Sequence, residues 1–154
     1  MQVQNGDFSI SERPIDMAAF RAALQDEQCG AFVLFEGWVR NHNDGREVGR
    51  LEYEAYIPMA EPLGREIVAE ALQRFDISRA AAVHRQGNLG LGEPAVVVGV
   101  ASSHRDAAFR ACRYIIDEIK HRVPIWKKEH YADGSTEWVD CRLTPGVKAE
   151  ETAG

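Results

Sequence analysis

Two lysines, Lys120 and Lys127, stand on either side of a proline in the segment 120–129 (KHRVPIWKKE). Lys120 falls in the last turn of a predicted helix, and Lys127 lies on the strand predicted to follow. The bend at Pro124 can therefore bring both side chains to one pocket. Neighbouring ammonium groups lower each other's pKa, which suits proton transfer or nucleophilic attack near neutral pH. The alternative is that Lys120 only faces the negative end of the helix dipole.

A second candidate anion site is the dipeptide His104-Arg105, where a predicted buried strand meets the start of the same helix. Free backbone N–H groups and the helix dipole add to the side-chain charge at such a position. The alternative is an ordinary helix start with a solvated arginine.

The charges of the chain are distributed unevenly. Between His104 and Lys128, seven basic side chains stand against three acidic ones, a net charge of +4 in a chain whose total is −6. This basic island indicates either a local anion site or a helix with a solvated basic face. The negative total argues against a general nucleic-acid-binding protein.

Three other features invite a chemical interpretation that their context opposes. The glycines of 87–92 (GNLGLG) precede a predicted strand, whereas a phosphate loop opens a helix, so an inter-strand turn is favoured. Ser103 and His104 are adjacent on a strand, point to opposite faces and lack a nucleophile-elbow pattern. The five histidines show no metal-ligand spacing, so neither a metal nor a cofactor is predicted.

The elements that must position these residues follow from hydrophobic periodicity and from turn signals. Helices are predicted over 11–28, 58–75 and 106–122. Strands are predicted over 31–39, 51–56, 79–84, 95–102, 125–131 and 136–141, with a polar loop at 40–49 and a Gly-rich turn at 86–93. The order mixes hairpins with helices without a regular βαβ repeat, which favours an α+β fold with a mainly antiparallel sheet.

The strand at 31–39 (AFVLFEGWV) is almost continuously apolar, which indicates burial on both faces, or on one face and a subunit interface. A single domain is expected over 1–142, followed by a mobile tail at 143–154.

The composition points to a cytoplasmic protein. No run approaches the roughly 18 apolar residues of a membrane span, and the first seven residues lack the pattern of a secretion signal. Three widely spaced cysteines predict neither a disulfide framework nor a zinc site, which suits a reducing compartment.

Several separate motifs, taken in order, resemble those of one family, the large, catalytic subunit of molybdopterin synthase. They are GWVRNHN at 37–43, HRQGNLGLGE at 84–93, the strand and helix start at 96–105, KHRVPIWKKE at 120–129 and WV at 138–139. The resemblance covers most of the chain, and its most specific part is 120–129.

The resemblance implies a sulfurtransferase of molybdenum cofactor biosynthesis, which converts cyclic pyranopterin monophosphate to molybdopterin. The sulfur would arrive as a thiocarboxylate on the C-terminus of a small ubiquitin-like partner subunit. Two large subunits would form a homodimer at the centre of a heterotetramer. The implied fold is an α/β hammerhead with an added antiparallel sheet.

Carried over onto this sequence, the family's motifs imply two groups of site residues. Lys120 and Lys127 would be the catalytic pair. The residues that would bind or lie beside the substrate are Trp38, Val39, Arg40, His104, Arg105, Lys128 and Glu129.

Two other functions remain to be weighed. A non-catalytic module could dock a ubiquitin-like C-terminal tail in its basic pocket, and an unrelated transferase could act on phosphorylated metabolites. Both explain the cations, but neither explains the ordered set of motifs.

Overall fold

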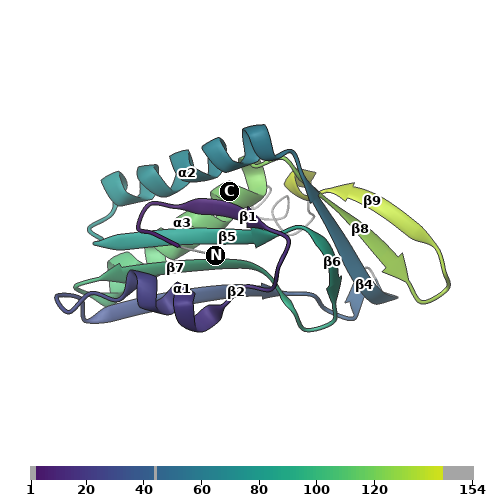
Figure 1. Cartoon of the computed structure of the whole chain (residues 1–154), viewed down its shortest axis with the longest axis horizontal. Helices are drawn as coiled ribbons and strands as arrows, with labels where there is room; N and C mark the ends of the chain where they lie inside the picture. Colours follow the sequence, from purple (N-terminus) through teal and green to yellow (C-terminus); the bar gives the residue numbers. More distant parts are fainter. Residues whose placement is uncertain (1–2, 44, 144–154) are drawn as a thin grey trace.

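Two β-sheets form the framework of the chain, whose computed structural model describes residues 3–43 and 45–143 (Figure 1). The predicted tail at 143–154 lies outside the described residues apart from Leu143. The first sheet has the order β1 (Phe8–Ser11), β5 (Arg79–Arg85), β7 (Pro94–Ser102), β2 (Ala31–Trp38). The second has the order β3 (His42–Asn43), β4 (Arg46–Ala55), β8 (Ile125–Tyr131), β9 (Thr136–Asp140), with β6 (Gly87–Gly90) paired to β4. Within residues 3–43 and 45–143, β1 and β5 are the only strands that pair in parallel, which confirms the predicted α+β class.

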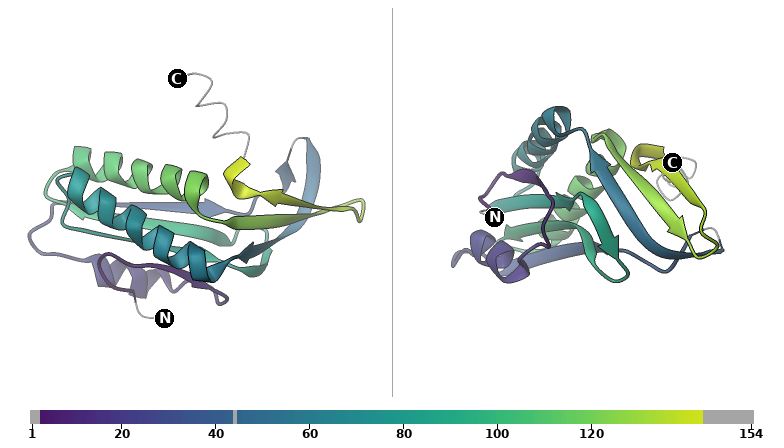
Figure 2. Two further views of the ribbon diagram at one scale, coloured as in Figure 1. Left: turned by 90° about the horizontal axis from the view of Figure 1, so that it is seen from above. Right: turned by 45° about the vertical axis from the view of Figure 1, so that its right-hand side comes forward.

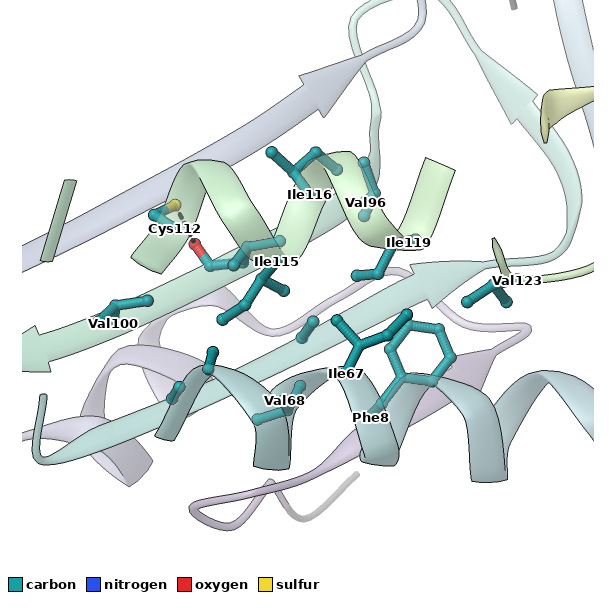
Figure 3. Packing of buried hydrophobic residues seen from close by; sticks show 14 of the residues in the cluster. Phe8, Ile67, Val68, Val96, Val100, Cys112, Ile115, Ile116, Ile119 and Val123 are labelled. Carbon is teal, nitrogen blue, oxygen red and sulfur yellow. Dashed lines mark hydrogen bonds between the residues drawn. The ribbon is translucent and has the colours of Figure 1, made fainter. Parts of the chain in front are cut away.

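Helices cover both faces of the first sheet (Figure 2). The helix α1 (Met17–Leu24) packs on one face, while α2 (Ile57–Arg74) and α3 (Arg105–Arg122) pack on the other. In the core beneath α2 and α3, Ile67 and Val68 point toward Ile115 (Figure 3). A Cβ at Gly64 would lie 2.1 Å from the ring of Phe8, so glycine lets α2 approach β1 this closely.

The helix α3 carries the residues of most chemical interest. Its apolar side chains recur at helical spacing, and Cys112, Ile115 and Ile119 are all buried. The helix ends at Arg122, where the N–H of Val123 still donates to the carbonyl of Ile119. Pro124 disfavours a helical conformation for the residue before it and starts the short bend into β8.

The predicted helix at 11–28 is wrong at both ends. The carboxylate of Asp16 accepts a hydrogen bond of 3.0 Å from the N–H of Ala19, and this cap fixes the start of α1. Ser11, the predicted first residue of the helix, is instead the last residue of β1 and pairs with Arg85 of β5. A four-residue edge strand depends on its partner, which no local sequence pattern reveals.

Two segments predicted as turns or loops contain strands. In the predicted loop at 40–49, His42–Asn43 pairs with the start of β4, which begins at Arg46. In the predicted turn at 86–93, Gly87–Gly90 forms β6 and pairs with β4. Gly87 has φ +95°, a conformation that lets the chain turn from the first sheet into the second. The segment leads into a strand and not into a helix, as predicted.

The strand predicted at 31–39 is an edge strand, β2, paired only with β7 within the described part of the chain. Its side chains are half-buried, and Phe35 and Trp38 are 37% and 67% exposed. Burial on both faces within one chain is therefore wrong, and a subunit interface remains a prediction. Among the described residues, none of the helices is long and apolar enough to cross a membrane.

Candidate active site

The two lysines singled out by the sequence share one cavity. Lys120 stands in the last turn of α3, and Lys127 lies on β8, directly after the Pro124 bend. They line a cavity of about 210 Å³, here called the lysine cavity. Its other lining residues are Trp38, Arg40, His42, Asn43, Val48, Leu51, Tyr53 and Glu129.

The walls of the lysine cavity come from elements that meet where the two sheets join. Strand β4 contributes Leu51 and Tyr53, and the segment after β2 contributes Arg40. On β8, alternate residues face the cavity, so Lys127 and Glu129 lie on its wall while Lys128 points to the other face. The cavity is thus open to a polar ligand but backed by packed secondary structure.

Burial and neighbouring groups change the pKa of Lys120. Burial lowers the pKa of Lys120, the nearby charge of Lys127 lowers it further, and Cys141 acts in the opposite direction. A lowered pKa leaves a larger fraction of the amine neutral near pH 7, so Lys120 can give and take a proton. The sequence predicted that Lys127 lowers the pKa of Lys120, but burial lowers that pKa more.

The buried carboxylate of Glu129 lies on the same β8 wall of the cavity as Lys127. Its Oε1 accepts hydrogen bonds of 3.0 Å from Asn43 Nδ2 and 3.0 Å from the hydroxyl of Tyr131. The Oδ1 of Asn43 in turn accepts from Arg40 Nη2 at 3.4 Å. A chain of hydrogen bonds therefore runs from a carboxylate inside the protein to a guanidinium at the exposed rim of the cavity.

Two residues predicted to contact the substrate lie elsewhere. Val39 is buried in an apolar cluster with Val48 and Leu51, directly after the register shift of β2 between Gly37 and Trp38. Lys128 lies with its Nζ 5.6 Å from the ring centroid of Trp138. Neither side chain lines the lysine cavity.

His104 and Arg105 lie at the opposite end of α3 from Lys120. Lys120 lies fifteen positions after Arg105 on α3, a distance of about 22 Å along the helix axis. Both side chains are exposed. Within one chain, the structure therefore does not bring them to the lysine cavity.

The basic island divides into side chains with different surroundings. Arg110 and Arg113 form ion pairs with Asp106 and Asp117 one turn away on α3. Arg122 binds Glu70 of α2 at 2.7 Å and Glu118 at 3.1 Å. For Arg110 and Arg113, whose side chains are mostly exposed, the alternative of a solvated basic face holds, whereas Arg122 joins α3 to α2.

Five residues that line the lysine cavity were not among the predicted site residues: His42, Asn43, Val48, Leu51 and Tyr53. Asn43 stands in the GWVRNHN motif, whose pattern could have signalled it. Tyr53 looked like an ordinary apolar position of an alternating strand. Burial raises the pKa of its hydroxyl, with smaller contributions from Cys141 and Glu129. Among the described residues, no cluster of three or more His, Cys, Asp or Glu could hold a metal ion.

Comparisons with solved structures agree with this architecture. Molybdopterin synthase from Staphylococcus aureus has a TM-score of 0.82 and 39% identity, covering 89% of this chain and 98% of that one. The MoaE protein of Burkholderia ambifaria has a TM-score of 0.78 and 34% identity, covering 96% of this chain and 98% of that one. A complex of subunits 1 and 2 of the molybdopterin-converting factor from Helicobacter pylori shares the fold at 19% identity, with a TM-score of 0.69.

Sequence comparisons extend the same relationship. The molybdopterin synthase catalytic subunit of Synechococcus elongatus is 44% identical over 131 residues, 84% of this chain and 79% of the relative. That of Thermoplasma volcanium is 46% identical over 129 residues, 84% of this chain and 94% of the relative. The model of one family, described as MoaE protein, matches residues 10–122. On this evidence the chain belongs to the MoaE family, that of the molybdopterin synthase catalytic subunits.

Proposed function

We propose that this chain is the catalytic subunit of a molybdopterin synthase and that the lysine cavity is its active site. It would transfer sulfur from the C-terminal thiocarboxylate of a small ubiquitin-like subunit to cyclic pyranopterin monophosphate. The observation that carries the proposal is the meeting of Lys120 and Lys127 in one cavity, with Arg40 at its rim. A cytoplasmic location is part of the same proposal.

The charges of the cavity suit this pair of reactants. The substrate phosphate and the thiocarboxylate are both anions, so they repel each other as they leave water. Fixed cations offset that repulsion and stabilise an oxyanion developing at the acyl carbon. Arg40 suits the phosphate because guanidinium can bind it with two hydrogen bonds. Lys127 would supply fixed positive charge beside Lys120.

The role of Lys120 follows from its burial. A half-buried amine with a lowered pKa can accept a proton in one step and return it in the next. Sulfur transfer needs such a group, because the attacking and leaving atoms change protonation during the reaction. A module that only docks a ubiquitin-like tail would gain nothing from a lowered pKa, since it needs the full charge.

His104 and Arg105 can contribute to this site only from a second copy of the chain. The strand β2 offers an exposed apolar edge for such a copy, with Phe35 and Trp38 on it. Trp38 also lines the lysine cavity, so a subunit covering this edge would lie beside the active site. The proposed assembly is a homodimer of this chain within a heterotetramer.

The test of the proposed function is a product analysis. The chain is mixed with the thiocarboxylated small subunit and cyclic pyranopterin monophosphate, and the pterins are identified by mass spectrometry. The proposal expects a product that has gained two sulfur atoms as a dithiolene. Binding of the small subunit without any sulfur-containing pterin would favour the docking module. Turnover of another phosphorylated metabolite would favour the unrelated transferase.

A further inference from the structure

His84 is a buried histidine that the reaction proposed above does not use. It lies near the end of β5, where alternate residues Ala80 and Ala82 pack into the core beneath α2 and α3. An apolar side chain would continue that core, yet the sequence places an imidazole there, only 4% exposed. A buried polar ring is costly unless its nitrogen atoms have partners.

The two ring nitrogens of His84 have different roles. Nδ1 lies 2.7 Å from the carbonyl oxygen of Arg85, and since a carbonyl can only accept, Nδ1 carries the hydrogen. The edge of the ring packs against Tyr53, with ring centroids 5.0 Å apart. Burial lowers the pKa of His84 to about 4, so the ring is neutral near pH 7 and its Nε2 is an acceptor.

His84 and Lys120 face the same small space. A cavity of about 10 Å³, here called the inner cavity, lies behind Lys120 and is lined by both side chains and by Cys141. Lys120 also lines the lysine cavity, so it stands between the two. Its positive charge makes a small contribution to the lowered pKa of His84, after the larger effect of burial.

We infer that His84 is a positioning residue for Lys120: the neutral imidazole, fixed by Arg85, presents Nε2 as an acceptor that holds the Lys120 amine between the two cavities. The contact passes through one water, for which the inner cavity between the two side chains is about large enough. This inference rests on the proposed function, because the held amine is the proposed acid–base group.

Other ionisable groups lie around Lys120 and must be kept constant. They come from every element packed around it: Tyr53 on β4, Cys141 in the short helix η1 (Cys141–Leu143), Lys127 and Glu129 on β8, and Arg40 and His42 at the rim. A substitution confined to His84 leaves all of them in place.

Two variants of His84 distinguish the role of its Nδ1 from that of its Nε2. His84→Asn keeps an N–H near the position of Nδ1 and removes the acceptor, whereas His84→Gln places an amide oxygen near the position of Nε2. The pH dependence of Lys120 acylation by acetic anhydride, followed by mass spectrometry, measures the pKa of Lys120 without any turnover. Single-turnover rates with thiocarboxylated small subunit and precursor are measured in parallel.

A neutral acceptor stabilises the ammonium form, so removing it should lower the pKa of Lys120. We expect the labelling midpoint of His84→Asn to fall by about one to two pH units and its turnover by about 10–100-fold. His84→Gln should have nearly the same labelling midpoint and the same turnover rate as the parent protein. Equal midpoints in the parent and both variants, or equal losses in both variants, would overturn the inference. If the parent catalyses no sulfur transfer, the labelling midpoints still decide the contact.

A measurement on the parent protein covers the case in which His84→Asn does not fold. Long-range ¹H–¹⁵N correlation spectra report the tautomer of each histidine directly. The inference expects His84 to remain neutral with its hydrogen on Nδ1 between pH 5 and 8. A hydrogen on Nε2, or a charged ring at pH 7, would contradict it.

Discussion

The last turn of α3 carries two cations that face different surroundings. Lys120 points into the lysine cavity, where burial and Lys127 lower its pKa. Arg122, two residues later, faces α2 and binds both carboxylate oxygens of Glu70, at 2.7 Å and 3.0 Å. The carboxylates pair with the charge of Arg122 and join α2 to α3. Lys120 instead has a lowered pKa, which lets it exchange protons near neutral pH. Neighbouring charges in a sequence can thus have unrelated roles, and their surroundings decide which.

The largest effect on turnover is expected from substitutions of the two lysines in the lysine cavity. Lys120→Ala and Lys127→Ala should each lower single-turnover conversion by about 10²–10⁴-fold, with Lys120→Ala the more damaging. Lys120 is anchored on a helix and has the lowered pKa. The melting temperature and the binding of the small subunit should be unchanged. Lys128→Ala, on the other face of β8, is the matched control, and an equal loss of turnover there would break the distinction between the two faces.

A subunit-exchange experiment tests whether Arg105, at the start of α3, acts in the same active site as Lys120, at its end. If Arg105 acts from the second copy, Lys120→Ala and Arg105→Ala should each be impaired as homodimers. A mixed dimer would still contain one site with both residues intact. Random exchange should then restore roughly a quarter of parent turnover, since half the dimers are mixed and half their sites are complete.

That result requires a dimer, which sedimentation of the parent chain at micromolar concentration can verify. A 17 kDa species alone would contradict the homodimer. No recovery of turnover after subunit exchange would place Arg105 outside the active site.

A smaller effect is expected at the rim. Arg40→Ala should raise the KM for the precursor by more than it lowers kcat, if the guanidinium binds phosphate equally in the ground and transition states. Asn43→Ala should cause a milder change of the same kind, because it frees Arg40 without removing its charge. Steady-state kinetics with varied precursor decide this. A collapsed kcat at unchanged KM would instead give Arg40 a role in the chemical step.

The smallest effect is expected on protein stability, from the ion pair between Arg122 and Glu70. The hydrogen bond from Arg122 lowers the pKa of Glu70 to about 2, helped by Tyr114. The stability from this pairing is therefore complete above the unfolded-state pKa of 4.5 and is lost as the pH falls toward 2. Glu70→Gln should cost about 1 kcal/mol at pH 7, since its side chain is 26% exposed and partly screened.

Thermal melting between pH 2 and 7 measures that cost, and turnover should be unaffected. A difference in stability that persists undiminished at pH 2 would show that the ionised carboxylate is not the source.

Long, strongly periodic segments were predictable from the sequence. The apolar run of β7 and the buried stripe of α3 need only local patterns, and Pro124 marks the bend that joins Lys120 to Lys127. Those features were sufficient to predict the shared cavity of the two lysines. The separation of Lys120 from His104 could also have been calculated, since a helix rises by about 1.5 Å per residue.

The rest depended on contacts between distant parts of the chain. The strand β1 exists because β5 offers it an edge, and β6 because β4 does. Val39 packs in an apolar cluster with residues of β4 directly after a register shift at Gly37, and no local pattern predicts such a contact. His84 looked like part of a motif, and its relation to Lys120 appears only when β5 and α3 are packed together.

The most direct test of the central claim is the single-turnover rate of Lys120→Arg with thiocarboxylated small subunit and precursor. Arginine keeps the positive charge of the cavity but cannot give up its proton at neutral pH. If Lys120 acts in proton transfer, the rate should fall about 100-fold or more while the melting temperature is unchanged. A Lys120→Arg protein with nearly the parent rate would contradict the claim and leave Lys120 only as a fixed charge.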